Sequence, residues 1–149
     1  MYAKGGHGSY YKDIKNVYGG AGIGGGANGC VDRIEINGGN VTAYGGYATN
    51  AGRHPGAAIG CGGGGAKAVE GGYKYGDIAI KGGTVSAIAY KNEVYAIGIA
   101  VKPGQSLPGG TLDGSISISN EATVNLNGGD YFPKSENSGL KNYTIQGTI

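Results

Sequence analysis

Three short apolar elements recur together, in one order, three times along the chain. Each copy has an Ile-Gly step, then an alternating Ile-x-Ile segment, then a turn and a second alternating segment. The Ile-Gly steps lie at 23–24, 59–60 and 97–98, the Ile-x-Ile segments at 34–36, 78–80 and 116–118, and the second segments at 41–43, 85–87 and 124–126. A repeat of this kind must be explained before any other feature, because it predicts stacked structural units.

Equivalent residues in successive copies are separated by a similar number of residues. Ile59 follows Ile23 by 36 residues and Ile97 follows Ile59 by 38. Alternation with period two is typical of half-buried strands, and no segment shows a helical period. A single copy cannot bury its apolar side, whereas stacked copies can pair each strand in parallel with its counterpart. We therefore predict an all-β, single-stranded parallel β-helix of about 3–4 coils.

The rival fold is an antiparallel sandwich or barrel, which also has many short strands with glycine-rich turns. It does not explain why three different elements recur together. We expect one β-helical domain over 1–149, which could belong to a longer surface protein. Its expected parts are a partial N-terminal coil at 1–20, repeats at 21–56, 57–94 and 95–130, and a C-terminal cap or partial coil at 131–149. Loops are expected on one flank, at 24–32, 61–76 and 99–114.

Glycine makes up 35 of the 149 residues, and much of it falls at the corners between the expected strands. Gly38-Gly39 and Gly82-Gly83 separate the two alternating segments, where glycine supplies backbone conformations that a sharp turn needs. The third copy has Asn120-Glu121 there instead.

When the three copies are aligned, Asp77 of the second copy falls at the same position as Arg33 of the first and Ser115 of the third.

Charge is nearly balanced, with 12 basic against 10 acidic residues and a net charge of +2. No run of Lys or Arg occurs, so we expect no nucleic-acid partner. No apolar stretch approaches the roughly 18 residues of a membrane span, so we expect no membrane insertion. The first ten residues lack the apolar core of a signal peptide. That leaves a cytoplasmic protein or a segment of a longer secreted one.

The pattern GAGIGGG at 20–26, followed by IEINGGNVTAYGG at 34–46, resembles a known family. It is similar to glycine-rich right-handed parallel β-helix repeats of secreted and cell-surface bacterial proteins, some of which bind carbohydrate. These proteins share the pectin-lyase-like architecture. The resemblance covers about residues 16–130 and implies a right-handed β-helix and an extracellular or cell-surface location. It implies no catalytic residue. The third copy departs from it, since it lacks the GIGGG run and the GG corner.

Tyrosine is the most suggestive side chain, with 12 copies against one Phe and no Trp. Tyrosines on one flank could offer flat apolar rings with hydrogen-bonding tips to a sugar. The alternative is that they cover the outside of the helix and pack under loops. Basic side chains in the same segments could meet acidic sugars. The candidate ligand-binding residues are Tyr44, Tyr47, Tyr73, Tyr75, Arg53 and Lys74.

The leading functional hypothesis is a non-catalytic, adhesin-like module that binds polysaccharide or another surface ligand. An alternative is a polysaccharide lyase or glycoside hydrolase, for which Asp32 and Asp77 would be the first candidates. The acidic residues are scattered singly, whereas glycoside hydrolysis needs two opposed carboxyl groups and calcium needs several oxygens. We expect no cofactor and no metal. A third possibility is a structural spacer, and coil ends could associate end to end or form homo-oligomers.

Two cysteines, Cys30 and Cys61, lie 31 residues apart. The preferred interpretation is two small, separate thiols in the core or in loops. A disulfide between neighbouring coils is the alternative, because both residues follow an Ile-Gly step. With neither a CxxC motif nor a paired His, they do not indicate zinc.

Overall fold

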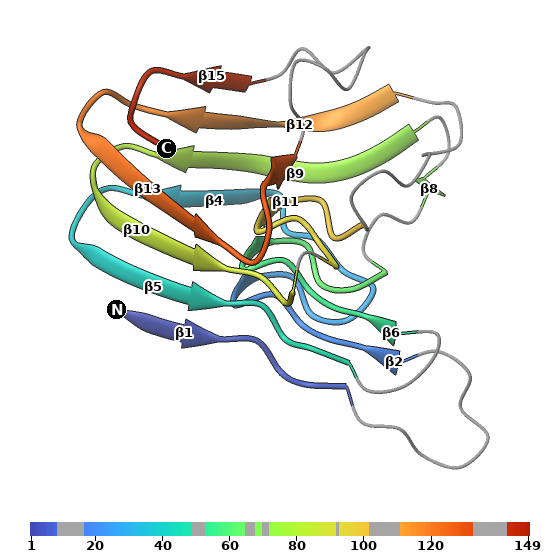
Figure 1. The fold of residues 1–149 in the computed structure, drawn as a ribbon. Coiled ribbons are helices and arrows are strands. Elements are labelled where there is room, and N and C mark those ends of the chain that lie inside the picture. Colours follow the sequence, from blue (N-terminus) through green and yellow to red (C-terminus); the bar gives the residue numbers. More distant parts are fainter. Residues whose placement is uncertain are drawn as a thin grey trace.

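The computed structural model is a solenoid of parallel strands (Figure 1). It describes residues 1–8, 17–48, 53–64, 68–69, 72–91, 93–101, 111–132 and 143–149. Within these ranges there are only strands, turns and irregular segments, and no helix long and apolar enough to cross a membrane. The prediction of an all-β parallel solenoid of about 3–4 coils is confirmed.

Three parallel sheets form the sides of the solenoid. The first sheet contains β1 (Tyr2–Lys4), β5 (Asn40–Tyr44), β10 (Gly83–Ile88) and β13 (Ala122–Asn127). The second sheet contains β3 (Ile23–Gly24), β7 (Ile59–Gly60), β11 (Ile97–Gly98) and β14 (Tyr131–Phe132). The third sheet contains β4 (Arg33–Ile36), β9 (Gly72–Ile80), β12 (Thr111–Ile118) and β15 (Tyr143–Ile145).

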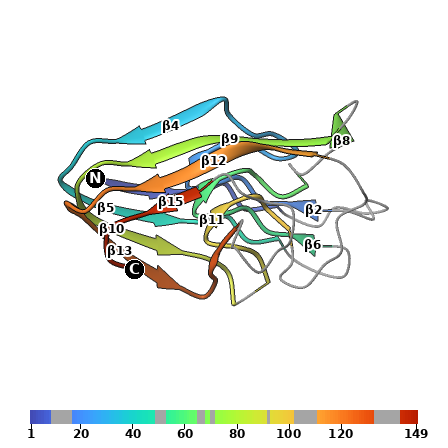
Figure 2. The same cartoon turned by 90° about the horizontal axis from the view of Figure 1, so that it is seen from above.

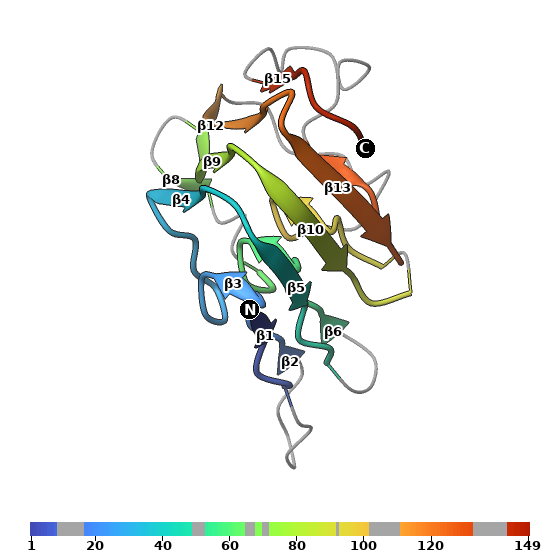
Figure 3. The same cartoon turned by 90° about the vertical axis from the view of Figure 1, so that its left-hand side faces the viewer.

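Two short pairings lie outside this scheme. Strands β2 (Val17–Tyr18) and β6 (Arg53–His54) form a parallel pair, and β8 (Ala68–Val69) pairs antiparallel with β9. Seen from above, the first and third sheets are two walls that meet where the third sheet turns into the first (Figure 2). Figure 3 shows β5, β10 and β13 side by side, with all three strands running in the same direction.

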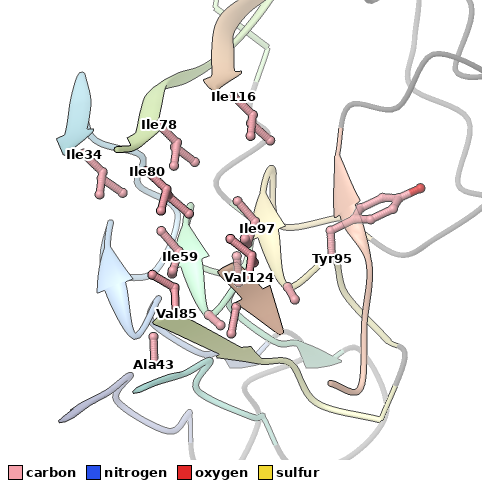
Figure 4. Close-up of a cluster of buried hydrophobic side chains, with 14 of the residues drawn as sticks. Ile34, Ala43, Ile59, Ile78, Ile80, Val85, Tyr95, Ile97, Ile116 and Val124 are labelled. Atoms are coloured by element: carbon pink, nitrogen blue, oxygen red, sulfur yellow. The ribbon is translucent and has the colours of Figure 1, made fainter. Parts of the chain in front are cut away.

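The strand register is the one the sequence repeat predicts. Ile59 pairs with both Ile23 and Ile97 in the second sheet, and Asp77 pairs with Arg33 and Ser115 in the third. Isoleucines of the third sheet point toward Ile59, Ile97 and the valines of the first sheet (Figure 4). Each fully buried Ile or Val contributes about 1.5–3 kcal/mol to stability. The core is therefore a set of apolar ladders along the solenoid axis.

Two of the expected loops are shorter than the sequence predicts. Strand β9 already begins at Gly72 and β12 at Thr111, so the expected loops 61–76 and 99–114 each end earlier. The reason is that β9 and β12 continue pairing past a bulge, where the register shifts between Asp113 and Gly114. The expected loop 24–32 does lie between β3 and β4, and the remainder of the other two falls mostly outside the described residues.

The second sheet depends on glycine at its closest approach. Gly24, Gly60 and Gly98 occupy equivalent places in successive coils, each with a positive φ. A Cβ on Gly60 would lie 2.2 Å from the carbonyl oxygen of Gly98, far inside van der Waals contact. No side chain fits there, so the Ile-Gly step is required by packing as well as by backbone conformation.

Cys30 and Cys61 form a disulfide, with their Cα atoms 4.3 Å apart. The preferred expectation of two separate thiols is therefore wrong. The loop after β3 reaches across to the next coil, where the Gly62 amide donates a hydrogen bond to the Gly29 carbonyl at 2.9 Å. That contact brings Cys30 beside Cys61, which lies directly after β7 and is fully buried.

We expect Gly60→Ala to destabilise the protein by about 3 kcal/mol or more, because the added Cβ meets backbone and the φ is strained. Urea denaturation measures the change. Gly38→Ala is the matched control, since a Cβ there meets nothing within 4 Å. It should change stability by less than about 0.5 kcal/mol. Equal effects of the two substitutions would contradict the close packing of the second sheet.

We expect loss of the disulfide to cost about 3–4 kcal/mol, the chain-entropy value for a closed loop of this length. The measurement is thermal unfolding of the oxidised chain with and without a phosphine reductant, compared with a Cys30→Ser, Cys61→Ser double variant. The reductant should lower the midpoint of the natural chain to that of the variant and leave the variant unchanged. An unchanged midpoint on full reduction would show that the disulfide does not stabilise the fold.

Candidate binding site at one corner of the solenoid

Aromatic rings gather where the chain leaves the strands of the first sheet. His7 follows β1, Tyr47 follows β5 and Tyr90 follows β10, so the three occupy similar places in successive coils. The ring centroids of His7 and Tyr47 are 4.0 Å apart, and those of Tyr47 and Tyr90 are 5.5 Å apart. We call these three residues the aromatic ladder.

The ladder follows from the coil spacing. Parallel strands lie about 4.8 Å apart, so aromatic residues at similar places in neighbouring coils come within ring-contact distance. The rings of Tyr47 and Tyr90 are stacked with 23° between their planes, whereas the ring of His7 is tilted by 41° from that of Tyr47. Tyr47 therefore has His7 on one side and Tyr90 on the other, yet it is 37% exposed. Its ring contacts one neighbour on each side and still remains partly open to solvent. That Tyr47 offers its ring to a ligand stays a prediction.

A hydrogen bond fixes the first ring of the ladder. The Tyr47 amide donates to Nδ1 of His7 at 3.1 Å, so that nitrogen must be unprotonated. The pKa of His7 is lowered, first by partial desolvation and second by the positive charge of Lys4. The imidazole is thus held neutral, with its proton on Nε2.

Further side chains extend the aromatic surface at both margins. Tyr44, half-buried at the end of β5, has its ring 5.2 Å from that of the exposed Tyr2. Lys91 holds its ammonium 5.4 Å from the Tyr90 ring centroid, within cation–π range. Sequence reasoning did not select His7, Tyr90 or Lys91. Their recurrence after equivalent strands was the available signal.

Tyr75 does not belong to any surface. It is 1% exposed and is the largest fully buried side chain described, so the prediction that it offers a ring to a ligand is wrong. The reason is the bulge in β9, where Lys74 pairs with Asp113 and Gly76 with Gly114, leaving Tyr75 as the extra residue. Its ring packs against Gly114, and burial raises the pKa of its phenol. The side chains of Tyr73, Arg53 and Lys74, also candidates, lie outside the described part of the structure.

Of the two candidate aspartates, Asp32 directly precedes β4 and Asp77 lies within β9, the neighbouring strand of the third sheet. The alignment of copies predicts the pairing of Asp77 with Arg33, and the structure confirms it. Asp77 lies beside Arg33, and its amide donates to the Asp32 carbonyl at 3.0 Å. The Asp77 carboxylate accepts a hydrogen bond from the Ser115 hydroxyl at 2.8 Å. Both aspartates are exposed, whereas a carboxyl that acts as a general acid at neutral pH is normally buried. The described residues contain no group of three His, Cys, Asp or Glu side chains placed to hold a metal ion.

An ion-pair network lies on the same outer face. The Glu35 carboxylate contacts Lys81 at 2.8 Å and Arg33 at 2.6 Å. Hydrogen bonds from Lys81 and then from Arg33 lower the pKa of Glu35 to about 2. All three side chains are exposed, so the network is screened by solvent and adds little to stability.

A second aromatic pair lies outside the ladder. The rings of Tyr18 and His54, which are register partners in β2 and β6, stack with centroids 4.9 Å apart.

Comparisons of the chain with protein-family models, with curated proteins and with solved structures found no match.

We expect the stability of the protein to fall as the pH drops below about 6.5, the pKa of an unperturbed histidine. The folded state lowers the pKa of His7, so the unfolded chain takes up this proton first and is favoured as the pH falls toward the folded pKa. Urea midpoints between pH 7.5 and pH 4.5 measure the effect. His7→Asn is the control, because its amide oxygen can accept the Tyr47 hydrogen bond without titrating. Parallel losses in both proteins would contradict a role for His7.

Proposed function

We propose that this chain is a non-catalytic extracellular or cell-surface module that binds polysaccharide at the corner that carries the aromatic ladder. The observation that carries the proposal is the row of Tyr47, Tyr90 and His7, which repeats from coil to coil; Tyr47 and His7 are exposed and Tyr90 is half-buried. Tyrosine combines a rigid apolar body with a polar tip, a combination that suits sugar rings, which present both C–H surfaces and hydroxyl groups. Because the row repeats along the solenoid axis, it suits a ligand that also repeats.

Two further observations support this assignment. The Cys30–Cys61 disulfide is of a kind that forms and persists in oxidising compartments, which supports a location outside the cytosol. The exposed Asp32 and Asp77 favour a binding module over an enzyme, because neither carboxyl has the enclosed surroundings of a catalytic acid.

The test is a screen of the purified chain against immobilised glycans, with and without calcium, followed by a reducing-end assay on every soluble glycan that binds. We expect saturable binding without release of new reducing ends. Tyr47→Ala should weaken binding about tenfold or more, since it removes the central ring and separates its two neighbours. Tyr47→Phe keeps the stack and removes only the hydroxyl, so its affinity measures the contribution of the polar tip.

Tyr18→Ala is the matched control, because it breaks the other His–Tyr stack and should leave glycan binding unchanged. Release of reducing ends would instead favour the enzyme, with Asp32 and Asp77 as the first residues to replace. A lack of binding to every glycan would favour a spacer or a module for a protein ligand.

A further inference from the structure

The outward face of the first sheet carries no charged side chain on its three longest strands. Burial alternates along β5, β10 and β13, which separates inward from outward positions. The outward residues are Asn40, Thr42, Tyr44, Thr84, Ser86, Ile88, Thr123, Asn125 and Asn127. The outer face of the third sheet differs sharply, since it carries exposed Arg33, Glu35, Asp77 and Asp113.

These outward residues form rows across the coils. Ser86 pairs with Thr42 on one side and Asn125 on the other, and Thr84 pairs with Asn40 and Thr123. Each row therefore places hydroxyl and amide groups at the strand spacing of about 4.8 Å. No hydrogen bond within the described part of the chain engages these side chains, so their donors and acceptors face outward for a ligand. Hydroxyl and amide groups both donate and accept hydrogen bonds.

From this arrangement we infer that the outward face of β5, β10 and β13 is the glycan-contacting surface, and that its ligand is an uncharged, repeating polysaccharide. The inference rests on the proposed function and adds the ligand class and the place where it lies. Acidic glycans and nucleic acids need cations to neutralise them, and these nine positions supply none. The cations Lys4, which pairs with Tyr44 from β1, and Lys91, which follows β10, lie at the margin of this face and not on it. A protein partner needs an apolar centre, whereas the central row Thr42–Ser86–Asn125 is small and polar.

The face is continuous with the aromatic ladder. Strand β5 ends at Tyr44, three residues before Tyr47, and β10 ends at Ile88, two residues before Tyr90. A row of polar groups thus adjoins a row of rings at the same corner. A polysaccharide chain that crosses the coils meets hydrogen-bonding groups on the sheet and apolar edges at its margin.

The test compares one substitution on two faces. Ser86→Glu places a carboxylate at the centre of the inferred surface, and Ser117→Glu places the same group on the outer face of the third sheet. Both serines are half-exposed, outward and in the interior of a strand. Binding of the full chain is measured by affinity electrophoresis in two uncharged polymers, mixed-linkage β-glucan and galactomannan, and in polygalacturonate. Circular dichroism and unfolding midpoints confirm that each variant folds.

We expect the natural chain to bind an uncharged polymer with an affinity that changes less than about twofold between 0.05 and 0.5 M NaCl, because screening has no ion pairs to weaken. Ser86→Glu should weaken binding about tenfold or more, since the ligand would have to desolvate a carboxylate. Ser117→Glu should have no effect. If Ser86→Glu does not fold, Asn125→Ala at an exposed position replaces it, with a loss of threefold or more expected.

Three results would overturn the inference. Unchanged binding in Ser86→Glu together with loss in Tyr47→Ala would move the site to the aromatic ladder alone, and the proposed function would stand. Salt-sensitive binding to polygalacturonate only would replace the ligand class, and the proposed function would again stand. A failure to bind any glycan would remove both.

Discussion

Every part of this molecule depends on the parallel pairing of each coil with the next. The pairing fixes which residues are neighbours, because side chains at equivalent positions of successive coils must share a row. Apolar rows make the core and polar or aromatic rows make the faces. Gly24 and Gly60 allow the strands of the second sheet to pair, since a side chain at either position would meet the backbone of the adjacent coil. The core and the outer faces are therefore two results of a single register.

Much of the fold could be predicted from the sequence because this register is written in the repeat. The pairing of Ile59 with Ile23 and Ile97, and of Asp77 with Arg33, followed directly from the alignment of copies. The strand starts at Gly72 and Thr111 did not follow. Pairing between β9 and β12 continues on the N-terminal side of a bulge. The alternating isoleucines at 78–80 and 116–118 lie on its C-terminal side and do not reveal that continuation. The disulfide, which the sequence made only the alternative to two separate thiols, was missed for a related reason, since its closure depends on the path of a glycine-rich loop.

The candidate site was predicted less well. The sequence predicts Tyr47 as a candidate, but not its ring contacts with His7 and Tyr90, which depend on how the coils stack. Tyr75 falls in the expected loop 61–76, which predicts an exposed ring, whereas in the structure it is the extra residue of the bulge in β9 and lies in the core. Composition identifies the kind of side chain that a surface uses. The coil-to-coil neighbours decide which part of that side chain a ligand can reach.

The link between Cys30 and Cys61 also has a mechanical consequence. Stacked coils contact only their neighbours, so a pulling force at one end tends to peel them away one at a time. Strands β1, β2 and β3 precede Cys30, and only they can detach from the N-terminal end before the load reaches the covalent bond. From there the force passes directly to Cys61 and bypasses β4, β5, β6 and β7, which all lie between the two cysteines. In a protein tethered at that end, those four strands would bear no tension while the disulfide is intact.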